Sequence, residues 1–261
     1  MSLADQVVVI TGASSGIGWA LAKALAAEQC RVGLVARRVD TLETLAAEIQ
    51  AAGGSVALAG ADVAERDQTL RAITQVRHQL GPIDLLVANA GVGAPTHLHP
   101  FNVDQVERMF RVNLFGVIYS IEAVLPEMLE RKRGHLCAVS SLAAYKGLPG
   151  DAAYCASKSA VNTYMEGLRI QLRAYNIAVT TICPGFVKTP MTDVFDFKMP
   201  FLMDADKAAR RIVKALGRRR KVYNFPWQTS LLMKLTNWLP DRVMAWAFRD
   251  QLEKPPPASA M

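Results

Sequence analysis

The stretch Val7-Val-Val-Ile-Thr-Gly-Ala-Ser-Ser-Gly-Ile-Gly18 decides the fold of this chain. Its first four residues form an apolar run rich in β-branched side chains, which is typical of a strand buried on both faces of a parallel sheet. A glycine-rich turn follows at once, and the alanine- and leucine-rich segment from Trp19 to Glu28 favours a helix. Strand, glycine-rich turn and helix in this order predict a dinucleotide-binding unit.

The turn supplies the groups that bind a pyrophosphate. Glycines let the backbone approach the phosphates closely, and the free N–H groups and dipole at the start of the helix favour negative charge. A glycine-rich loop alone is often only a tight turn, so the flanking strand and helix carry the prediction. The residues expected to contact the cofactor here are Gly12, Ser14, Ser15, Gly16, Ile17 and Gly18.

The end of a second predicted strand, residues 31–36, indicates which dinucleotide binds. An NAD-binding unit places an acidic residue about 20 residues beyond the glycine motif, on the ribose 2′-hydroxyl. This chain has Ala36, Arg37 and Arg38 in that zone. Two guanidinium groups offer forked, charge-assisted bonds to a 2′-phosphate, so we predict NADP(H) as the preferred cofactor and NAD(H) as the alternative. The arginines can also be interpreted as a solvated pair in a loop.

Helices and strands continue to alternate along the chain, with no internal repeat and no interdomain linker, which predicts a single α/β domain. We expect the helix at 103–133 to bend near Gly116 and Pro126. The further helices are expected at about 40–52, 65–80, 153–175 and 205–216, and the further strands at 55–59, 83–87, 136–139, 177–183 and 221–225.

Polar residues follow two of the predicted strands. Asp62 and Val63 come after residues 55–59, where they can meet an adenine edge, or Asp62 can instead cap the next helix. Asn89-Ala-Gly91 closes the strand at 83–87, at the end where open α/β sheets bind their ligands. Asp62, Val63 and Asn89 are therefore candidate cofactor contacts.

The segment from Ser141 to Lys158 carries the candidate chemistry. Tyr154 and Lys158 are four residues apart, so they share one face of a helix. A phenol has a pKa of about 10, and a neighbouring ammonium favours its phenolate, which suits the tyrosine to general acid catalysis. Ser141 follows an apolar run, and Asn113 stands inside a predicted helix despite its poor propensity, which indicates a hydrogen-bonding role or a solvated face. Tyr-x-x-x-Lys also occurs by chance on many helices.

Two apolar segments depart from the regular alternation. We interpret residues 186–203 as a lid over a substrate pocket, within a catalytic domain of residues 1–226, although a loop packed on the core is the alternative. Residues 227–253 place leucine and tryptophan at helical spacing, which predicts a helical extension that packs on the domain or a partner, or lies on a membrane surface. Residues 254–261 are expected to be disordered.

The composition argues against several classes of function. Net charge is +7, but the basic residues are scattered and lack the basic face of a nucleic-acid-binding module. Four widely separated cysteines argue against a disulfide framework and favour a reducing compartment, so we expect a cytoplasmic protein. His97-x-His99 fits a surface loop better than a metal site, and no metal is predicted. We see neither a signal peptide nor an uninterrupted apolar run of membrane-spanning length.

Together these motifs resemble the short-chain dehydrogenase/reductase family over about residues 5–225. The resemblance implies a single-domain, doubly wound Rossmann fold with a central, largely parallel seven-stranded sheet. It also implies a homodimer or homotetramer formed through the long helices at about 103–131 and 153–175. The motifs that carry it are Thr11-Gly-x-x-x-Gly16-Ile-Gly18, Asn89-Ala-Gly91, Asn113, Ser141, Tyr154-x-x-x-Lys158, and Pro184-Gly185 with Thr189.

The resemblance assigns a role to each catalytic residue. Tyr154 would be the proton donor or acceptor, and Lys158 would lower its pKa and hold the nicotinamide ribose. Ser141 would bond the substrate oxygen. Asn113 would fix a water molecule in a proton relay to Lys158.

The remaining matched residues concern the cofactor. Val187 and Thr189 would contact the nicotinamide amide. Ser15 stands where NADP-dependent members often have a basic residue, so Arg37 would carry more of the phosphate contact.

We therefore predict an NADP(H)-dependent oxidoreductase that interconverts a small hydrophobic ketone or aldehyde and its alcohol. The alternatives are an NAD-dependent alcohol dehydrogenase of the same family and a peripheral, membrane-associated reductase of lipids or steroids. A regulator that binds the cofactor without chemistry would be expected to lack one of the three residues Ser141, Tyr154 and Lys158, which are all present.

Overall fold

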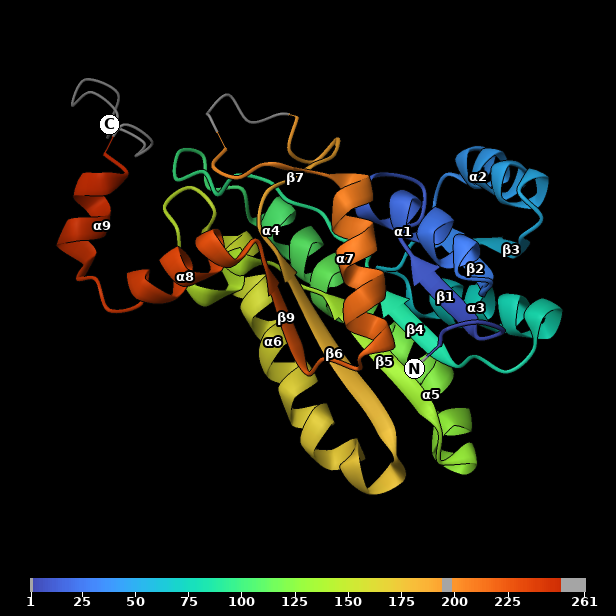
Figure 1. The fold of residues 1–261 in the computed structure, drawn as a ribbon. Helices are drawn as coiled ribbons and strands as arrows, with labels where there is room; N and C mark the ends of the chain where they lie inside the picture. Colours follow the sequence, from blue (N-terminus) through green and yellow to red (C-terminus); the bar gives the residue numbers. More distant parts are fainter. Residues whose placement is uncertain (1, 194–198, 250–261) are drawn as a thin grey trace.

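The computed structural model describes residues 2–193 and 199–249, and Figure 1 shows their arrangement. Seven strands form one wholly parallel sheet in the order β3-β2-β1-β4-β5-β6-β9. The predicted doubly wound α/β fold with seven central strands is thus confirmed. The strands are β1 Val7–Thr11, β2 Arg31–Ala36, β3 Ser55–Gly60, β4 Leu85–Ala88, β5 Gly134–Val139, β6 Ile177–Pro184 and β9 Val222–Phe225.

Helices cover both faces of the sheet (Figure 1). One face packs against α1 Gly16–Ala27, α2 Val39–Ala51 and α7 Ala205–Gly217, and the other against α3 Arg66–Leu80, α5 Gly116–Arg131 and α6 Ala152–Gln171. Side chains alternate along a strand, so Val8 and Ile10 of β1 join the first core and Val7 and Val9 join the second. Burial on both faces explains why this strand is uniformly apolar.

The strand order places a crevice beside β1. The strand pairs with β2 on one side and β4 on the other, so the chain winds outward in both directions from this point. Ligands of open α/β sheets bind at such a switch point, outside the carboxyl ends of the strands. The glycine-rich turn after β1 and the Asn89-Ala-Gly91 segment after β4 meet there.

The helix predicted at 103–133 is continuous, and its distortion is a π-helical turn directly before Gly116, near one of the two positions expected to bend. It consists of α4 Val103–Phe110, a π-helical turn at Arg111–Phe115 and α5, and Pro126 lies inside α5 without ending it. The π turn is centred on Asn113, and such insertions often occur at functional sites. Among the described residues this run alone is long and apolar enough to span a membrane, but part of its apolar surface, including Ile121 and Met128, packs on the sheet.

Three other segments depart from the prediction. The helix expected to reach Tyr175 ends at Gln171 and continues as a 3₁₀ turn, η3 Leu172–Tyr175. The 186–203 segment is anchored at its base by a small parallel ladder between β7 Val187–Lys188 and β8 Met203–Asp204. Its residues 194–198 lie outside the described part of the chain, and so does the tail at 250–261, which includes the residues expected to be disordered.

The C-terminal extension forms two short helices, α8 Trp227–Thr236 and α9 Asp241–Ala247. Figure 1 shows them projecting from the domain beyond the edge strand β9. α8 packs against β9 and against η2, the 3₁₀ turn Leu142–Tyr145 that follows β5. The extension is therefore helical over these two segments, and it contacts the domain through α8.

Candidate active site

A cavity of about 410 Å³ opens at the carboxyl ends of the central strands. It gathers nearly all residues that the sequence nominated, although they come from widely separated parts of the chain. Gly18 and Asn113 lie behind its wall. The nominated residues that line it are Gly12, Ser14, Ser15, Gly16, Ile17, Arg37, Arg38, Asp62, Val63, Asn89, Ser141, Tyr154, Lys158, Val187 and Thr189.

The glycine-rich turn forms an open anion-binding end on α1. Ser15 is the N-cap residue, but its side chain makes no capping hydrogen bond, and the first turn of α1 has no acidic residue. The N–H groups at this helix start are thus available to a pyrophosphate. Close packing explains Gly18, since a Cβ there would lie 2.3 Å from Gly12 O. Gly12 has φ +68°, and its Cβ would lie 2.7 Å from Ala90 Cα.

Asn89 holds the turn in place. Its Nδ2 donates to the carbonyl oxygens of Thr11 at 3.0 Å and Gly12 at 3.3 Å. The hydroxyl of Thr11 in turn accepts from the backbone N–H groups of Asn89 at 3.1 Å and Ala90 at 3.2 Å. Asn89 therefore joins the ends of β1 and β4 and also lines the cavity. The sequence analysis predicted only a cofactor contact for this residue and did not predict its structural role.

Two arginines occupy the rim beyond β2. Arg38 Nη2 donates to the backbone oxygen of Ser14 at 3.1 Å and to its hydroxyl at 3.2 Å, so one guanidinium lies over the glycine-rich turn. Arg37 forms an exposed ion pair with Asp62, with 3.6 Å between Nη1 and Oδ2. The proposed capping role of Asp62 is wrong, because the N-cap residue of α3 is Glu65 and Asp62 Oδ1 accepts from Ala64 N at 3.0 Å.

Tyr154, Lys158 and Ser141 come together at the inner end of the cavity. α6 carries Tyr154 and Lys158 on one face, and Ser141 is the N-cap residue of η2, two residues after the end of β5. Lys158 is buried, donates from Nζ to the carbonyl of Val139 at 3.0 Å, and has its Nζ 5.9 Å from the Tyr154 ring centroid. Ser141 lies within hydrogen-bonding reach of the Tyr154 side chain, and its Oγ accepts from Ala143 N at 3.1 Å.

Burial controls the titration of both groups. It raises the pKa of Tyr154 to about 12, although the hydrogen bond from Ser141 opposes the rise. Burial also lowers the pKa of Lys158 to about 8. The expected lowering of the tyrosine pKa by Lys158 is therefore not found in this structure, because burial of the phenol raises the pKa and the Lys158 ammonium donates to the Val139 carbonyl. With this pKa the phenol is protonated at neutral pH.

Asn113 is fully buried, so the alternative of a solvated face is wrong. Its Oδ1 accepts from Val92 N at 2.8 Å, and its Nδ2 donates to Val92 O and to Ser157 Oγ, both at 2.9 Å. Gly91 lies between Lys158 and Asn113, since a Cβ there would be 3.1 Å from Lys158 Nζ and 3.3 Å from Asn113 Oδ1. The π turn thus fastens the loop after β4 beside the lysine.

The sequence analysis missed two residues that hold this arrangement. Ser157 Oγ donates to the carbonyl of Tyr154 at 2.8 Å and accepts from Asn113. Thr192 Oγ1 donates to Val187 O at 2.9 Å and accepts from Thr189 N at 2.9 Å, which fixes the segment predicted to meet the nicotinamide. A serine beside a lysine and a threonine in a loop carry no distinctive spacing, so no sequence signal identified them.

A metal centre has no support in the described residues. No group of three or more His, Cys, Asp or Glu side chains that could hold an ion occurs among residues 2–193 and 199–249. His97 and His99 are exposed in the segment between β4 and α4, as a surface loop predicts.

A parallel sheet with an open glycine-rich helix start at its switch point and a Ser-Tyr-Lys cluster beside it defines a nicotinamide-dinucleotide oxidoreductase of Rossmann type. A model of the family described as short chain dehydrogenase matches residues 6–198. The chain belongs to this family and is an NAD(P)-dependent short-chain dehydrogenase/reductase.

Individual relatives agree with this assignment. An uncharacterized oxidoreductase of Myxococcus xanthus is 42% identical over 94% of this chain and 96% of its own length. An alcohol dehydrogenase from Thermococcus sibiricus, solved with 5-hydroxy-NADP, superposes with a TM-score of 0.76 at 28% identity over 84% of this chain and 94% of that one. A Burkholderia phymatum short chain dehydrogenase/reductase in complex with NAD shares the fold, with a TM-score of 0.83 at 24% identity over 98% and 99% of the two chains.

Proposed function

We propose that this enzyme prefers NADP(H) and reduces a hydrophobic ketone or aldehyde, or oxidises the corresponding alcohol. The observation that carries the cofactor preference is the rim beyond β2, where Arg37 and Arg38 replace the acidic residue that would bond a ribose 2′-hydroxyl. A bound 2′-phosphate would compete with the Asp62 carboxylate for the Arg37 guanidinium. That exchange is favourable in charge, since a phosphate carries more negative charge and more acceptor oxygens than a carboxylate.

The residues of the inner cavity support proton transfer by Tyr154. When bound, the nicotinamide supplies or accepts the hydride. Ser141 lies within hydrogen-bonding reach of Tyr154, so the two hydroxyls can orient one carbonyl oxygen between them. Tyr154 donates its proton to that oxygen during reduction, and the nearby Lys158 cation stabilises the phenolate that remains.

The walls of the cavity favour an apolar substrate. Val92, Val112 and Met191 line it, and Phe201 and Leu202 are exposed within the predicted lid. Apolar walls with a few oriented polar groups are typical of pockets for small hydrophobic molecules. Closing 186–203 over the substrate would exclude water from the reaction, as the lid interpretation requires.

We further propose a homodimer or homotetramer that works in the cytoplasm. Val103 on α4 and Phe115 at the end of the π turn expose apolar surface along the long helices expected to form the interface. All four cysteines are free and buried, which suits a reducing compartment. Sedimentation equilibrium tests the assembly, and a monomer at micromolar concentration would contradict it.

Steady-state kinetics test the chemical proposal. NADPH and NADH oxidation is followed with a series of ketones of increasing apolar size, for the wild type, Tyr154→Phe and the control Tyr164→Phe, which changes another half-buried tyrosine of α6. We expect NADPH to be used more efficiently, larger apolar ketones to react faster, and Tyr154→Phe to lower kcat by about 10²–10⁴-fold. Equal use of NADH would refute the NADP(H) preference, and a preference for small polar sugars would refute the hydrophobic substrate. An unchanged kcat in Tyr154→Phe would refute proton transfer by Tyr154.

A further inference from the structure

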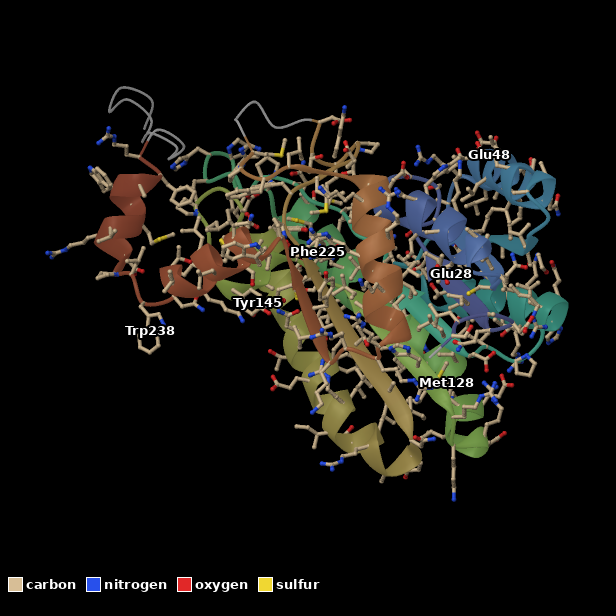
Figure 2. The ribbon with its side chains drawn as sticks, in the orientation of Figure 1. Glu28, Glu48, Met128, Tyr145, Phe225 and Trp238 are labelled. Atoms are coloured by element: carbon tan, nitrogen blue, oxygen red, sulfur yellow. The ribbon has the colours of Figure 1, made fainter. Side chains whose placement is uncertain are left out.

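The two helices of the C-terminal extension face solvent with their apolar side. The three tryptophans of the extension are the most exposed of its large side chains, with 69% of Trp227, 87% of Trp238 and 68% of Trp246 exposed. Leu231, Leu232, Leu235, Leu239 and Val243 are exposed as well. Figure 2 shows Trp238 pointing away from the domain at the junction of α8 and α9. A patch of this kind marks an interaction site on a folded protein.

The inner face of α8 is the more polar one. Thr229 and Ser230 are buried against the domain, and the hydroxyl of Thr229 has no hydrogen-bond partner among the described residues. A surface helix of a globular protein normally has the opposite pattern, with its apolar stripe inward. Packing on its own domain therefore leaves the apolar stripe of α8 uncovered.

The inner face nevertheless holds α8 firmly to the active-site end of the domain. The Lys234 ammonium lies 5.9 Å from the ring centroid of Tyr145, which belongs to η2 next to Ser141. Pro226, at the start of α8, packs against Gly185, where a Cβ would lie 3.2 Å from its Cδ. The extension is thus attached beside the cavity through α8, and we call the exposed surface of α8 and α9 the platform.

The charges and the tryptophans identify the surface that fits this platform. Residues 227–253 carry the basic residues Lys234, Arg242 and Arg249 and the acidic residues Asp241, Asp250 and Glu253, so the basic excess is confined to the part up to Arg249. A two-fold contact between copies of the chain would bring these like charges together, whereas an anionic surface attracts them. Tryptophan favours the boundary between lipid and water, and basic residues beside an apolar helix face favour anionic headgroups.

We propose that α8 and α9 bind the surface of a membrane that contains anionic phospholipids. The tryptophan and leucine side chains enter the headgroup boundary, and Arg242 and Arg249 contact the lipid phosphates. The enzyme then sits on the membrane with its cavity close to the lipid. This inference does not depend on the cofactor or the reaction proposed above.

Vesicle co-sedimentation of the full chain tests the proposal. The vesicles are phosphatidylcholine alone or phosphatidylcholine with phosphatidylserine, and the three extension tryptophans also provide a fluorescence signal. We expect tighter binding to the anionic vesicles, a blue shift on binding, and a decrease of about ten-fold or more in the partition coefficient for Leu231→Ser/Leu235→Ser/Trp238→Ser. Arg242→Glu should weaken binding to the anionic vesicles only, and Val39→Ser on α2 should bind as the wild type does.

Two further measurements keep the outcome decisive. Thermal unfolding and NADPH oxidation in solution should be unchanged in the triple variant, because none of its residues lines the cavity. No binding to either vesicle by the wild type, or equal binding by the triple variant, would overturn the proposal. A triple variant that falls from dimer to monomer in sedimentation while vesicle binding is absent would show that the platform covers a second copy of the chain.

Discussion

Replacing Asn113 with alanine should destabilise the protein as well as impair catalysis. The substitution removes the hydrogen bonds with Val92 N, Val92 O and Ser157 Oγ. Ser157 keeps the Tyr154 carbonyl as a partner, but the two backbone groups of Val92 lose the amide that pairs with them. A buried polar group left unpaired costs about 1–3 kcal/mol.

The magnitude follows from these two groups. Two unpaired groups give about 2–6 kcal/mol, and the lower half of this range applies because Val92 is only half-buried and water can replace part of the loss. For a domain of this size, 1 kcal/mol lowers Tm by about 2–4 °C. We therefore expect Asn113→Ala to lower Tm by roughly 4–16 °C.

Thermal unfolding followed by circular dichroism measures this effect, and Asn162→Ala is the matched control. Asn162 lies on α6 and accepts only from the thiol of Cys183, at 3.7 Å, so its loss should lower Tm by no more than about 2 °C. At temperatures where Asn113→Ala is folded, its kcat should fall, because the loop at Gly91 beside Lys158 is released. A Tm equal to that of Asn162→Ala would refute the structural role of the amide.

Three other predictions rest on single contacts. Arg37→Leu should lower kcat/KM for NADPH by about 10–100-fold and leave kcat/KM for NADH nearly unchanged, because a charge-assisted bond to the 2′-phosphate is lost. Arg71→Leu on α3 is the control. Equal losses with both cofactors would contradict the assignment of Arg37 to the 2′-phosphate. Gly18→Ala should abolish NADPH binding in titration calorimetry while far-ultraviolet circular dichroism is retained, since its Cβ meets Gly12 O at 2.3 Å; normal affinity would show that the turn adapts. Burial lowers the pKa of His135 from 6.5 to about 4, so the fold has its full stability above pH 6.5 and loses about 3 kcal/mol as the pH falls towards 4. The free energy of unfolding, measured with urea across this range, should therefore depend less on pH in His135→Gln than in the wild type. An identical pH profile would refute His135 as the cause of the loss.

The sequence predicts the fold well because its signals are local. Val7 to Ile10 must be a two-sided buried strand, and the turn up to Gly18 needs glycine at positions that the packing confirms. The four-residue spacing of Tyr154 and Lys158 places both on one face of α6 for the same reason. Contacts within one turn or one helix depend on residues that are close in sequence, so the residue spacing alone predicts them.

Features that depend on distant partners were not predictable. The π turn at Arg111–Phe115 exists together with hydrogen bonds from Asn113 to Val92, which belongs to the loop after β4. The pKa of Tyr154 was expected to fall because Lys158 is near in sequence, but it rises because other segments bury the phenol. Burial is a property of the assembled cavity, and no local pattern encodes it.

The catalytic side chains are held by the ends of different strands, which explains why one crevice can combine them. Lys158 is tied to the carbonyl of Val139 at the end of β5, and Asn113 is tied to the loop after β4. Ser157 connects the two, because it accepts from Asn113 and donates to the backbone of Tyr154 on α6. A displacement of either strand end would therefore shift α6 relative to the cavity, and Ser157 would influence the proposed proton transfer through this geometry without contacting the substrate.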